Sequence, residues 1–150
     1  MIPKTHHNKY WICWPESYEY PSVVQLYQAC GYGGGVDNED KVVIAEASGQ
    51  LIGAVRICTE QGVQVLRGMQ IIKSYHGKGI GSLVLQFLKD NIVMTGCYCL
   101  PYKHLTGFYG QIGFELISAD EAPVFLAERL EKYLSIGNTE MVMMKVMIKS

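Results

Sequence analysis

Three glycines alternate along a short stretch of the chain, Gly77, Gly79 and Gly81, between an apolar segment and a helical pattern. Glycine adopts positive φ angles without strain and, because it has no Cβ, lets a ligand approach the backbone closely. The first amides of the following helix are unpaired and carry the positive end of its dipole, which favours a bound pyrophosphate. The side chains of His76 and Lys78 would add donors. The pattern therefore predicts a phosphate-binding turn, and a purely structural turn is the alternative.

Two common phosphate-binding motifs do not fit this spacing. The dinucleotide fingerprint has glycines at relative positions one, three and six, but the sixth position counted from Gly77 is Ser82. The P-loop needs a glycine five residues before a Gly-Lys-Ser/Thr triplet. Here Ile72 occupies that place, and Gly79 follows Lys78 instead of Ser or Thr.

The segment from His76 to Gly81 resembles motif A of the GNAT superfamily of N-acetyltransferases, written Arg/Gln-x-x-Gly-x-Gly/Ala. In that family the motif holds the pyrophosphate of acetyl-coenzyme A; His76 replaces the usual Arg or Gln. The resemblance also implies that backbone amides at the end of the preceding strand polarise the thioester carbonyl. The cofactor-binding residues that it implies are Met69, Gln70, Ile71, His76, Gly77, Lys78, Gly79, Ile80, Gly81 and Ser82.

A second motif follows at roughly the distance expected in the same family. Residues 108–114, Phe-Tyr-Gly-Gln-Ile-Gly-Phe, resemble the GNAT signature Phe-Tyr-x-x-x-Gly-Phe, and the order of elements is similar over about residues 41–114. The resemblance implies an α/β (α+β) fold: a mixed, mostly antiparallel central sheet of six to seven strands with a parallel splayed pair, flanked by helices. Tyr102 and Leu105 stand where the family often has Asn and a small residue, so those cofactor contacts are not transferred.

Acetyl transfer from a thioester to an amine needs a neutral nucleophile, stabilisation of the developing oxyanion and a proton for the departing thiolate. Tyr109, in the second motif, is the candidate general acid. An unperturbed tyrosine titrates near about 10 and a thiol near about 8.5, so the phenol is protonated at neutral pH. A packing role at helical spacing is the alternative for Tyr109, and Tyr98 and Tyr102 are nearby substitutes.

A general base is not evident. The motif A strand offers Arg67 and Gln70, neither of which accepts a proton at neutral pH. The remaining candidates are His104, Glu46 and Glu60. His104 titrates in the right range, although its place at a helix start equally indicates a capping or surface role. Because a lysine-like amine needs about 5 kcal/mol to lose its proton at pH 7, a missing base favours a weakly basic amine or an inactive domain.

The elements that would position these residues follow from apolar periodicity and turn residues. Strands are predicted at residues 9–14, 41–47, 51–58, 63–72, 96–100, from 114 onward and at 141–148. Helices are predicted from Pro21 to about Cys30 and at residues 80–91, 104–112 and 124–134. The acidic loop with Asp37, Glu39 and Asp40 is a solvated connection or an entrance for a cationic acceptor.

Composition limits the remaining possibilities. With 150 residues, 49% of them hydrophobic, the chain is expected to form one domain over residues 1–150. A net charge of −1 does not favour nucleic acid or an anionic membrane as a partner. The five cysteines are expected to be reduced core thiols; no second pair completes a zinc site around Cys97 and Cys99, so no metal is predicted. No signal peptide or membrane span is visible, which predicts a cytoplasmic protein.

These patterns together predict an acetyl-coenzyme A-dependent N-acetyltransferase with a small-molecule or peptide amine as substrate. The alternative is a non-catalytic acyl-coenzyme A-binding module that regulates a protein partner, which the missing base favours. A nucleotide-binding α/β domain of another kind is a more distant alternative. The sequence leaves open the identity of the acceptor and the oligomeric state, a homodimer included.

Overall fold

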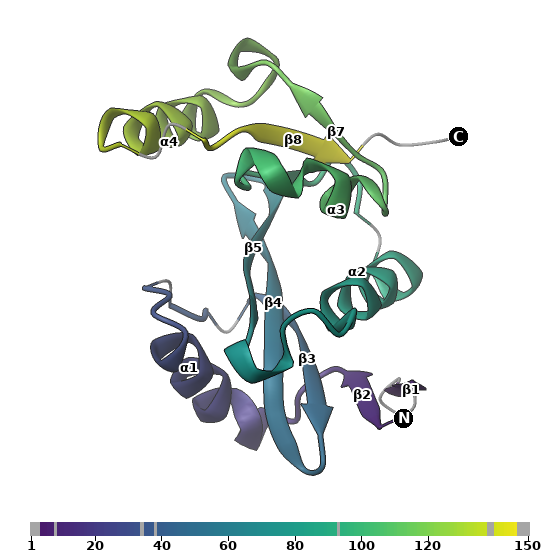
Figure 1. Cartoon of the computed structure of the whole chain (residues 1–150). Coiled ribbons are helices and arrows are strands. Elements are labelled where there is room, and N and C mark those ends of the chain that lie inside the picture. The colour runs from purple at the N-terminus through teal and green to yellow at the C-terminus, as the bar shows by residue number, and fades with distance from the viewer. Residues whose placement is uncertain are drawn as a thin grey trace.

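The computed structural model describes residues 4–7, 9–33, 35–37, 39–92, 94–137 and 140–146. Figure 1 shows a twisted central sheet with helices on both sides. The described strands form one eight-stranded sheet in the order β1-β2-β3-β4-β5-β6-β8-β7. They are β1 (Lys4–His7), β2 (Tyr10–Cys13), β3 (Lys41–Ala47), β4 (Gln50–Glu60), β5 (Val63–Ile71), β6 (Tyr98–Cys99), β7 (Phe114–Ile117) and β8 (Met143–Val146).

Neighbouring strands are antiparallel except β5 and β6, which run parallel. This arrangement confirms the predicted mixed, mostly antiparallel sheet with one parallel pair. The short strand β1 has no counterpart among the predicted strands, and it brings the described sheet to eight strands. The predicted last strand is confirmed over β8, while residues 147 and 148 lie outside the described residues.

The described helices agree with the predicted periodic segments. They are α1 (Tyr20–Ala29), α2 (Ile80–Asn91), α3 (Thr106–Gly110) and α4 (Val124–Ser135). Pro21 lies in the first turn of α1, where a missing N–H leaves no helical hydrogen bond unmade. The predicted helix over residues 104–112 is shorter than expected, because a 3-10 turn over Lys103–Leu105 leads into α3.

Strand β3 shows why both faces of the sheet are covered. Val43 and Ala45 belong to the apolar cluster that contains α2 side chains, whereas Val42 and Ile44 belong to the cluster that contains α1 side chains. Successive side chains of a strand point to opposite faces, so an unbroken apolar strand is buried on both. A third cluster packs Leu126 of α4 against the β6 and β8 end of the sheet.

None of the five cysteines forms a disulfide; Cys13, Cys58, Cys97 and Cys99 are buried, and Cys30 is half-buried. Within the described ranges, no helix is both long and apolar enough to cross a bilayer. The same residues contain no group of three His, Cys, Asp or Glu side chains arranged to hold a metal ion.

The parallel strands β5 and β6 separate soon after they pair, and this opens the sheet. Strand β6 has two residues, and its ladder with β5 consists of Val65 opposite Tyr98. Strand β5 continues to Ile71 with β4 on its other side. No described strand therefore pairs the β6-facing backbone groups of the rest of β5. The chain then enters α2 through a 3-10 turn, Lys73–Tyr75, and the glycine turn.

Candidate active site

The glycine turn has the geometry of a ligand cradle. Gly77 and Gly79 adopt φ angles of 75° and 78°, and a Cβ added at either would meet no heavy atom within 4 Å. Gly79 is the N-cap of α2, and no side chain caps the amides of the first turn. These amides and the helix dipole therefore border open space in which an anionic group fits. Lys78 is exposed in the same turn.

Gly81 has a different purpose from the other two glycines. A Cβ at Gly81 would lie 2.9 Å from Cζ of Phe108, so only glycine lets the ring of α3 pack against the start of α2. Phe108 begins the second motif, which means that the two motifs meet in space. The next residue, Tyr109, lies on the same helix and belongs to the apolar cluster that contains Ile80 at the start of α2.

His76 braces the turn against the strand that precedes it. Its Nε2 lies 2.6 Å from the carbonyl oxygen of Ile71, the last residue of β5. This one hydrogen bond ties the residue before the glycine turn to the end of β5. Met69, Gln70 and Ile71 are the last three residues of β5, directly before this turn, and their contact with an extended cofactor stays a prediction.

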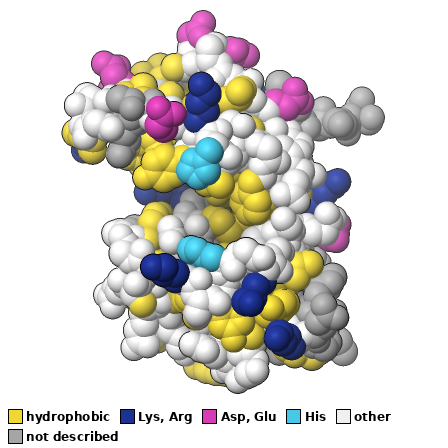
Figure 2. Space-filling model, in the orientation of Figure 1, with side chains coloured by type: hydrophobic (Ala, Val, Ile, Leu, Met, Phe, Trp, Pro, Cys, Tyr) yellow, Lys and Arg dark blue, Asp and Glu magenta, His cyan; other side chains and the backbone are white. Residues whose placement is uncertain are grey.

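A cavity of 220 Å³ opens where β5 and β6 diverge. Figure 2 shows a hollow on this face of the molecule, with hydrophobic side chains inside it and histidine side chains at its rim. The cavity is lined by Tyr32, Val65, Leu66, Arg67, Gly68, Cys99, Leu100, Pro101, Tyr102, Tyr109, Arg129, Tyr133 and Met141. Its walls therefore come from β5, from the segment after β6, from α3 and α4, and from the loop after α1.

Tyr109 is a buried side chain that lines this cavity. Its ring lies 4.9 Å from Phe108 and 5.9 Å from Phe114, both in edge-on geometry. Burial raises the pKa of Tyr109 above its usual value, with a smaller contribution from the nearby Cys99. The phenol therefore stays protonated at neutral pH, and its hydroxyl can donate a hydrogen bond to a departing thiolate.

Gly68 makes a bulge in β5 at the wall of the cavity. Its φ angle is 67°, and a Cβ there would lie 2.8 Å from the Tyr27 hydroxyl and 3.2 Å from the ring of Tyr32. The register between β4 and β5 shifts at this point, between Ala54 and Arg56. A glycine inside a strand pattern is the sequence signal for such a bulge or close approach. The sequence-based reasoning missed it.

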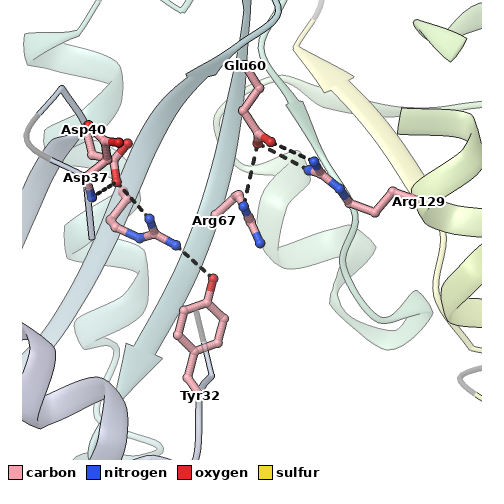
Figure 3. Close-up of polar contacts among 7 residues, drawn as sticks. Tyr32, Asp37, Asp40, Glu60, Arg67 and Arg129 are labelled. Atoms are coloured by element: carbon pink, nitrogen blue, oxygen red, sulfur yellow. Dashed lines mark hydrogen bonds and ion pairs between the residues drawn. The ribbon is translucent and has the colours of Figure 1, made fainter. Parts of the chain in front are cut away.

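The loop after α1 is fixed by a buried arginine (Figure 3). Arg56 of β4 donates hydrogen bonds to Oδ2 of Asp40 at 2.7 Å and to the hydroxyl of Tyr32 at 3.0 Å. Its guanidinium also lies over the rings of Tyr27 and Tyr32. Burial alone would lower the pKa of Arg56, but the hydrogen bond to Asp40 reverses this and the pKa is raised. Arg56 thus holds Tyr32 in the cavity wall.

The base candidates are spread over the molecule. His104 is exposed and stacks on Tyr102, a cavity-lining residue, with ring centroids 5.9 Å apart. Glu46 lies on β3, two strands away from β5, where its Oε1 accepts a hydrogen bond from Sγ of Cys13 at 3.5 Å. The cavity thus has His104 near its mouth, whereas Glu46 is not among its lining residues.

Glu60 is engaged by two arginines. Its carboxylate accepts hydrogen bonds from Arg129 at 2.6 and 3.2 Å and lies 3.8 Å from Nη1 of Arg67. The hydrogen bond from Arg129 holds the pKa of Glu60 below its usual value, against the opposing effect of burial. A carboxylate stabilised in this way is a weak base.

Arg67 separates two cavities. A second cavity, of 370 Å³, is lined by Gly35, Val36, Asp37, Glu39, Asp40, Arg56, Cys58, Thr59, Glu60 and Arg67. Arg67 and Arg129 were not predicted as site residues. Arg129 comes more than sixty positions after Arg67 in the sequence, so only the packing of α4 brings the two side chains to the same cavity.

Solved structures share this fold across nearly the whole chain. N-acetylglutamate synthase from Neisseria gonorrhoeae, solved with coenzyme A and N-acetyl-glutamate, matches 96% of this chain with 18% identity and a TM-score of 0.64. The match spans 37% of that chain, so the sequence covers well under half of the synthase's length. The ribosomal-protein-S18-alanine N-acetyltransferase from Escherichia coli matches with 10% identity and a TM-score of 0.65, over 94% of this chain and 96% of its own.

A third similar structure is Arabidopsis thaliana Naa50 in complex with the bisubstrate analogue CoA-Ac-MVNAL. It has 14% identity and a TM-score of 0.63, over 93% of this chain and 99% of its own. No curated protein matches the sequence significantly. The sequence model of the Acetyltransferase (GNAT) domain matches residues 38–116, which include both predicted motifs in full. Because this match covers more than half of the 150 residues, the protein belongs to the GNAT family of acetyltransferases.

Proposed function

We propose that this protein is an N-acetyltransferase that uses acetyl-coenzyme A as acetyl donor and a small-molecule or peptide amine as acceptor. The observation that carries the proposal is the contact between Gly81 and Phe108. It joins an open, positive-φ glycine turn to the helix that places Tyr109 in the cavity wall. A phosphate cradle and a buried proton donor thus lie on two elements packed together. The single domain over residues 1–150 and the cytoplasmic location remain predictions from the sequence.

The comparisons support the choice of donor. The synthase from Neisseria gonorrhoeae was solved with coenzyme A, and Naa50 with an analogue that joins coenzyme A to a peptide. In this protein the amides of residues 77–82 would hold the pyrophosphate, with Lys78 as an additional cation. The β6-facing backbone groups of Met69, Gln70 and Ile71 would bond the extended arm, because β6 does not extend along them.

The chain's own groups then account for the transfer. The amine nitrogen bonds to the acetyl carbonyl carbon while the carbon–sulfur bond breaks, and backbone amides of β5 stabilise the negative charge on the carbonyl oxygen. Tyr109 gives its hydroxyl proton to the departing sulfur. The proton lost from the amine nitrogen returns Tyr109 to its neutral form through water, so the products are an amide and a thiol.

The described cavity wall offers no carboxylate as a base for the proton of the acceptor amine. Among the described residues that line the cavity, none is Asp, Glu or His. His104 remains the base candidate nearest the cavity mouth, through its stacking on Tyr102. Glu46 would have to act from β3, so we place it second.

The proposal is tested by mixing the purified protein with acetyl-coenzyme A and a panel of amino acids, peptides, amines and polyamines. Released coenzyme A is followed by chromatography, since the five protein thiols would react with thiol reagents. Release that depends on the presence of an amine is the expected result. Stabilisation by acetyl-coenzyme A in a melting experiment without release for any amine would instead favour the acyl-coenzyme A-binding module. If acetyl-coenzyme A neither releases coenzyme A with any amine nor stabilises the protein, both functions are refuted.

A further inference from the structure

The cavity between β5 and β6 has a cationic wall. Its lining residues include Arg67 from β5 and Arg129 from α4, and among the described lining residues none is acidic. The remaining walls are tyrosines, aliphatic side chains and backbone. An acceptor amine that enters this cavity therefore meets positive charge and apolar surface.

The two arginines differ in how far their charge is already neutralised. Arg129 donates two hydrogen bonds to the carboxylate of Glu60, at 2.6 and 3.2 Å, which occupies one edge of its guanidinium. Arg67 lies 3.8 Å from the same carboxylate, too far for a hydrogen bond, and its side chain is 33% exposed. One carboxylate thus faces two guanidiniums (Figure 3), and Arg67 keeps its donors for another anion.

Arg67 is also close to the place of transfer. It directly precedes Gly68, the bulge residue of β5, and it lines the same cavity as Tyr109. At about 3.3 Å per residue, three strand residues separate Gly68 from Ile71 by roughly 10 Å. A small acceptor whose anionic group contacts Arg67 can therefore hold its amine near the acetyl end of a cofactor bound along β5.

The same wall disfavours protonated amines. An ammonium group beside guanidiniums, in a partly desolvated cavity, is destabilised both by like charge and by burial, so the amine loses its proton more readily. This effect assists an acceptor in a site without a carboxylate base, but it repels polyamines and similar cations. An acceptor that also carries a negative charge is attracted to the arginines, and this attraction offsets the repulsion of its ammonium group.

We propose that the acceptor is a small amine that carries a carboxylate or a phosphate, and that Arg67 binds this anionic group. This inference rests on the proposed acetyl transfer, since the cavity is taken as the acceptor site. Charge-assisted hydrogen bonds from an arginine are directional and suit both oxyanions. The acidic residues Asp37 and Glu39 line the second cavity and are not among the described residues that line the first.

The kinetic test compares matched acceptors with and without the anion. Each amino acid of the panel is compared with its amide, and glucosamine 6-phosphate is compared with glucosamine. Spermidine serves as the cationic amine. The anionic member of at least one pair is expected to have a kcat/KM about tenfold or more above its neutral partner, as for a hydrogen bond to a charged group. Arg67→Gln should abolish that preference mainly through KM, Arg67→Lys should restore part of it, and Lys132→Gln, an exposed charge on α4, should leave it unchanged.

A binding test decides the inference when no acceptor supports turnover. N-acetylated amino acids, their amides and N-acetylglucosamine 6-phosphate are titrated by calorimetry into protein saturated with coenzyme A. Binding of an anionic probe that is lost in Arg67→Gln and kept in Lys132→Gln supports the inference, and the carboxylate and phosphate arms identify the anion. Equal binding of neutral and anionic probes, an unchanged preference in Arg67→Gln, or no binding by any probe would overturn it. Absence of coenzyme A release with every amine would count separately, against the proposed transfer.

Discussion

Tyr109 is the side chain on which the proposed chemistry depends most. It is buried, edge-on to Phe108 and Phe114, and lines the cavity where the acetyl group would lie. We expect Tyr109→Phe to lower kcat by about 10²-fold, the lower part of the range for loss of a general acid. The dissociation constant of acetyl-coenzyme A, measured by calorimetry, should change little because the ring remains. Tyr18→Phe, at a side chain that is 78% exposed, is the matched control. An unchanged kcat in Tyr109→Phe would remove Tyr109 from the mechanism.

The raised pKa of Tyr109 also predicts the pH dependence of the reaction. Burial shifts this pKa above the usual tyrosine value of about 10, so the acidic form persists to higher pH than in an exposed tyrosine. The value of kcat/KM should therefore rise as the acceptor amine deprotonates and should not fall again below about pH 10. Steady-state rates between pH 6 and pH 10 would check this. A descending limb with a midpoint near pH 8 that disappears in Tyr109→Phe would show that the tyrosine ionises too early.

The residues of this site differ in how far the sequence could predict them. The turn at Gly77 and Gly79 was predictable because a positive φ angle is a local backbone property, whereas the packing of Gly81 against Phe108 joins distant segments. Arg67 was noted only as a residue unable to act as a base. Its position between two cavities depends on the packing of α4, which no local pattern encodes. Glu60 was an open base candidate, and its pairing with Arg129 is likewise a contact between distant segments.

At the scale of the elements, the loop between α1 and β3 owes its position to one buried ion pair. The side chains of Arg56 and Asp40 are 4% and 6% exposed, and Arg56 also holds Tyr32. Removing one partner of a buried pair leaves an uncompensated charge, so Asp40→Asn should lower the free energy of unfolding by about 3 kcal/mol. In a domain of this size that corresponds to a fall in Tm of roughly 6–12 °C.

Thermal unfolding followed by circular dichroism would measure this effect of Asp40→Asn. The control is Asp90→Asn, because Asp90 is exposed and accepts one hydrogen bond from Gln86 within α2. Equal Tm values for Asp40→Asn and Asp90→Asn would mean that the loop is held by its apolar contacts instead.

Elements with strong periodicity were predicted almost to the residue. Strand β3 matches its predicted bounds, Lys41–Ala47, and β5 ends one residue before the predicted end. The helix predicted over residues 104–112 was too long, since apolar spacing continues through the 3-10 turn and the turn after α3. Strand β6 was predicted with five residues and has two, because the divergence of β5 and β6 depends on how the two halves of the sheet pack.

For the whole molecule, the divergence of β5 and β6 organises the account. It leaves backbone groups of β5 without a partner among the described strands, and it opens the cavity on one side. Near the same opening, Phe108 of α3 packs against Gly81 at the start of α2. The similar solved structures share this fold at 10–18% identity, which shows how little of it depends on particular side chains. The proposed acceptor site, in contrast, is lined by Tyr32, Arg67 and Arg129, which come from three separate parts of the chain.

Hydrogen–deuterium exchange with and without saturating acetyl-coenzyme A tests the central claim most directly. The account predicts slower exchange in peptides covering residues 77–82 and 69–71, because their amides would bond the pyrophosphate and the arm of the cofactor. Peptides from α4, residues 124–135, should exchange at the same rate in both conditions. Slower exchange that spares residues 77–82, while melting experiments show that acetyl-coenzyme A binds, would contradict the account and place the cofactor elsewhere.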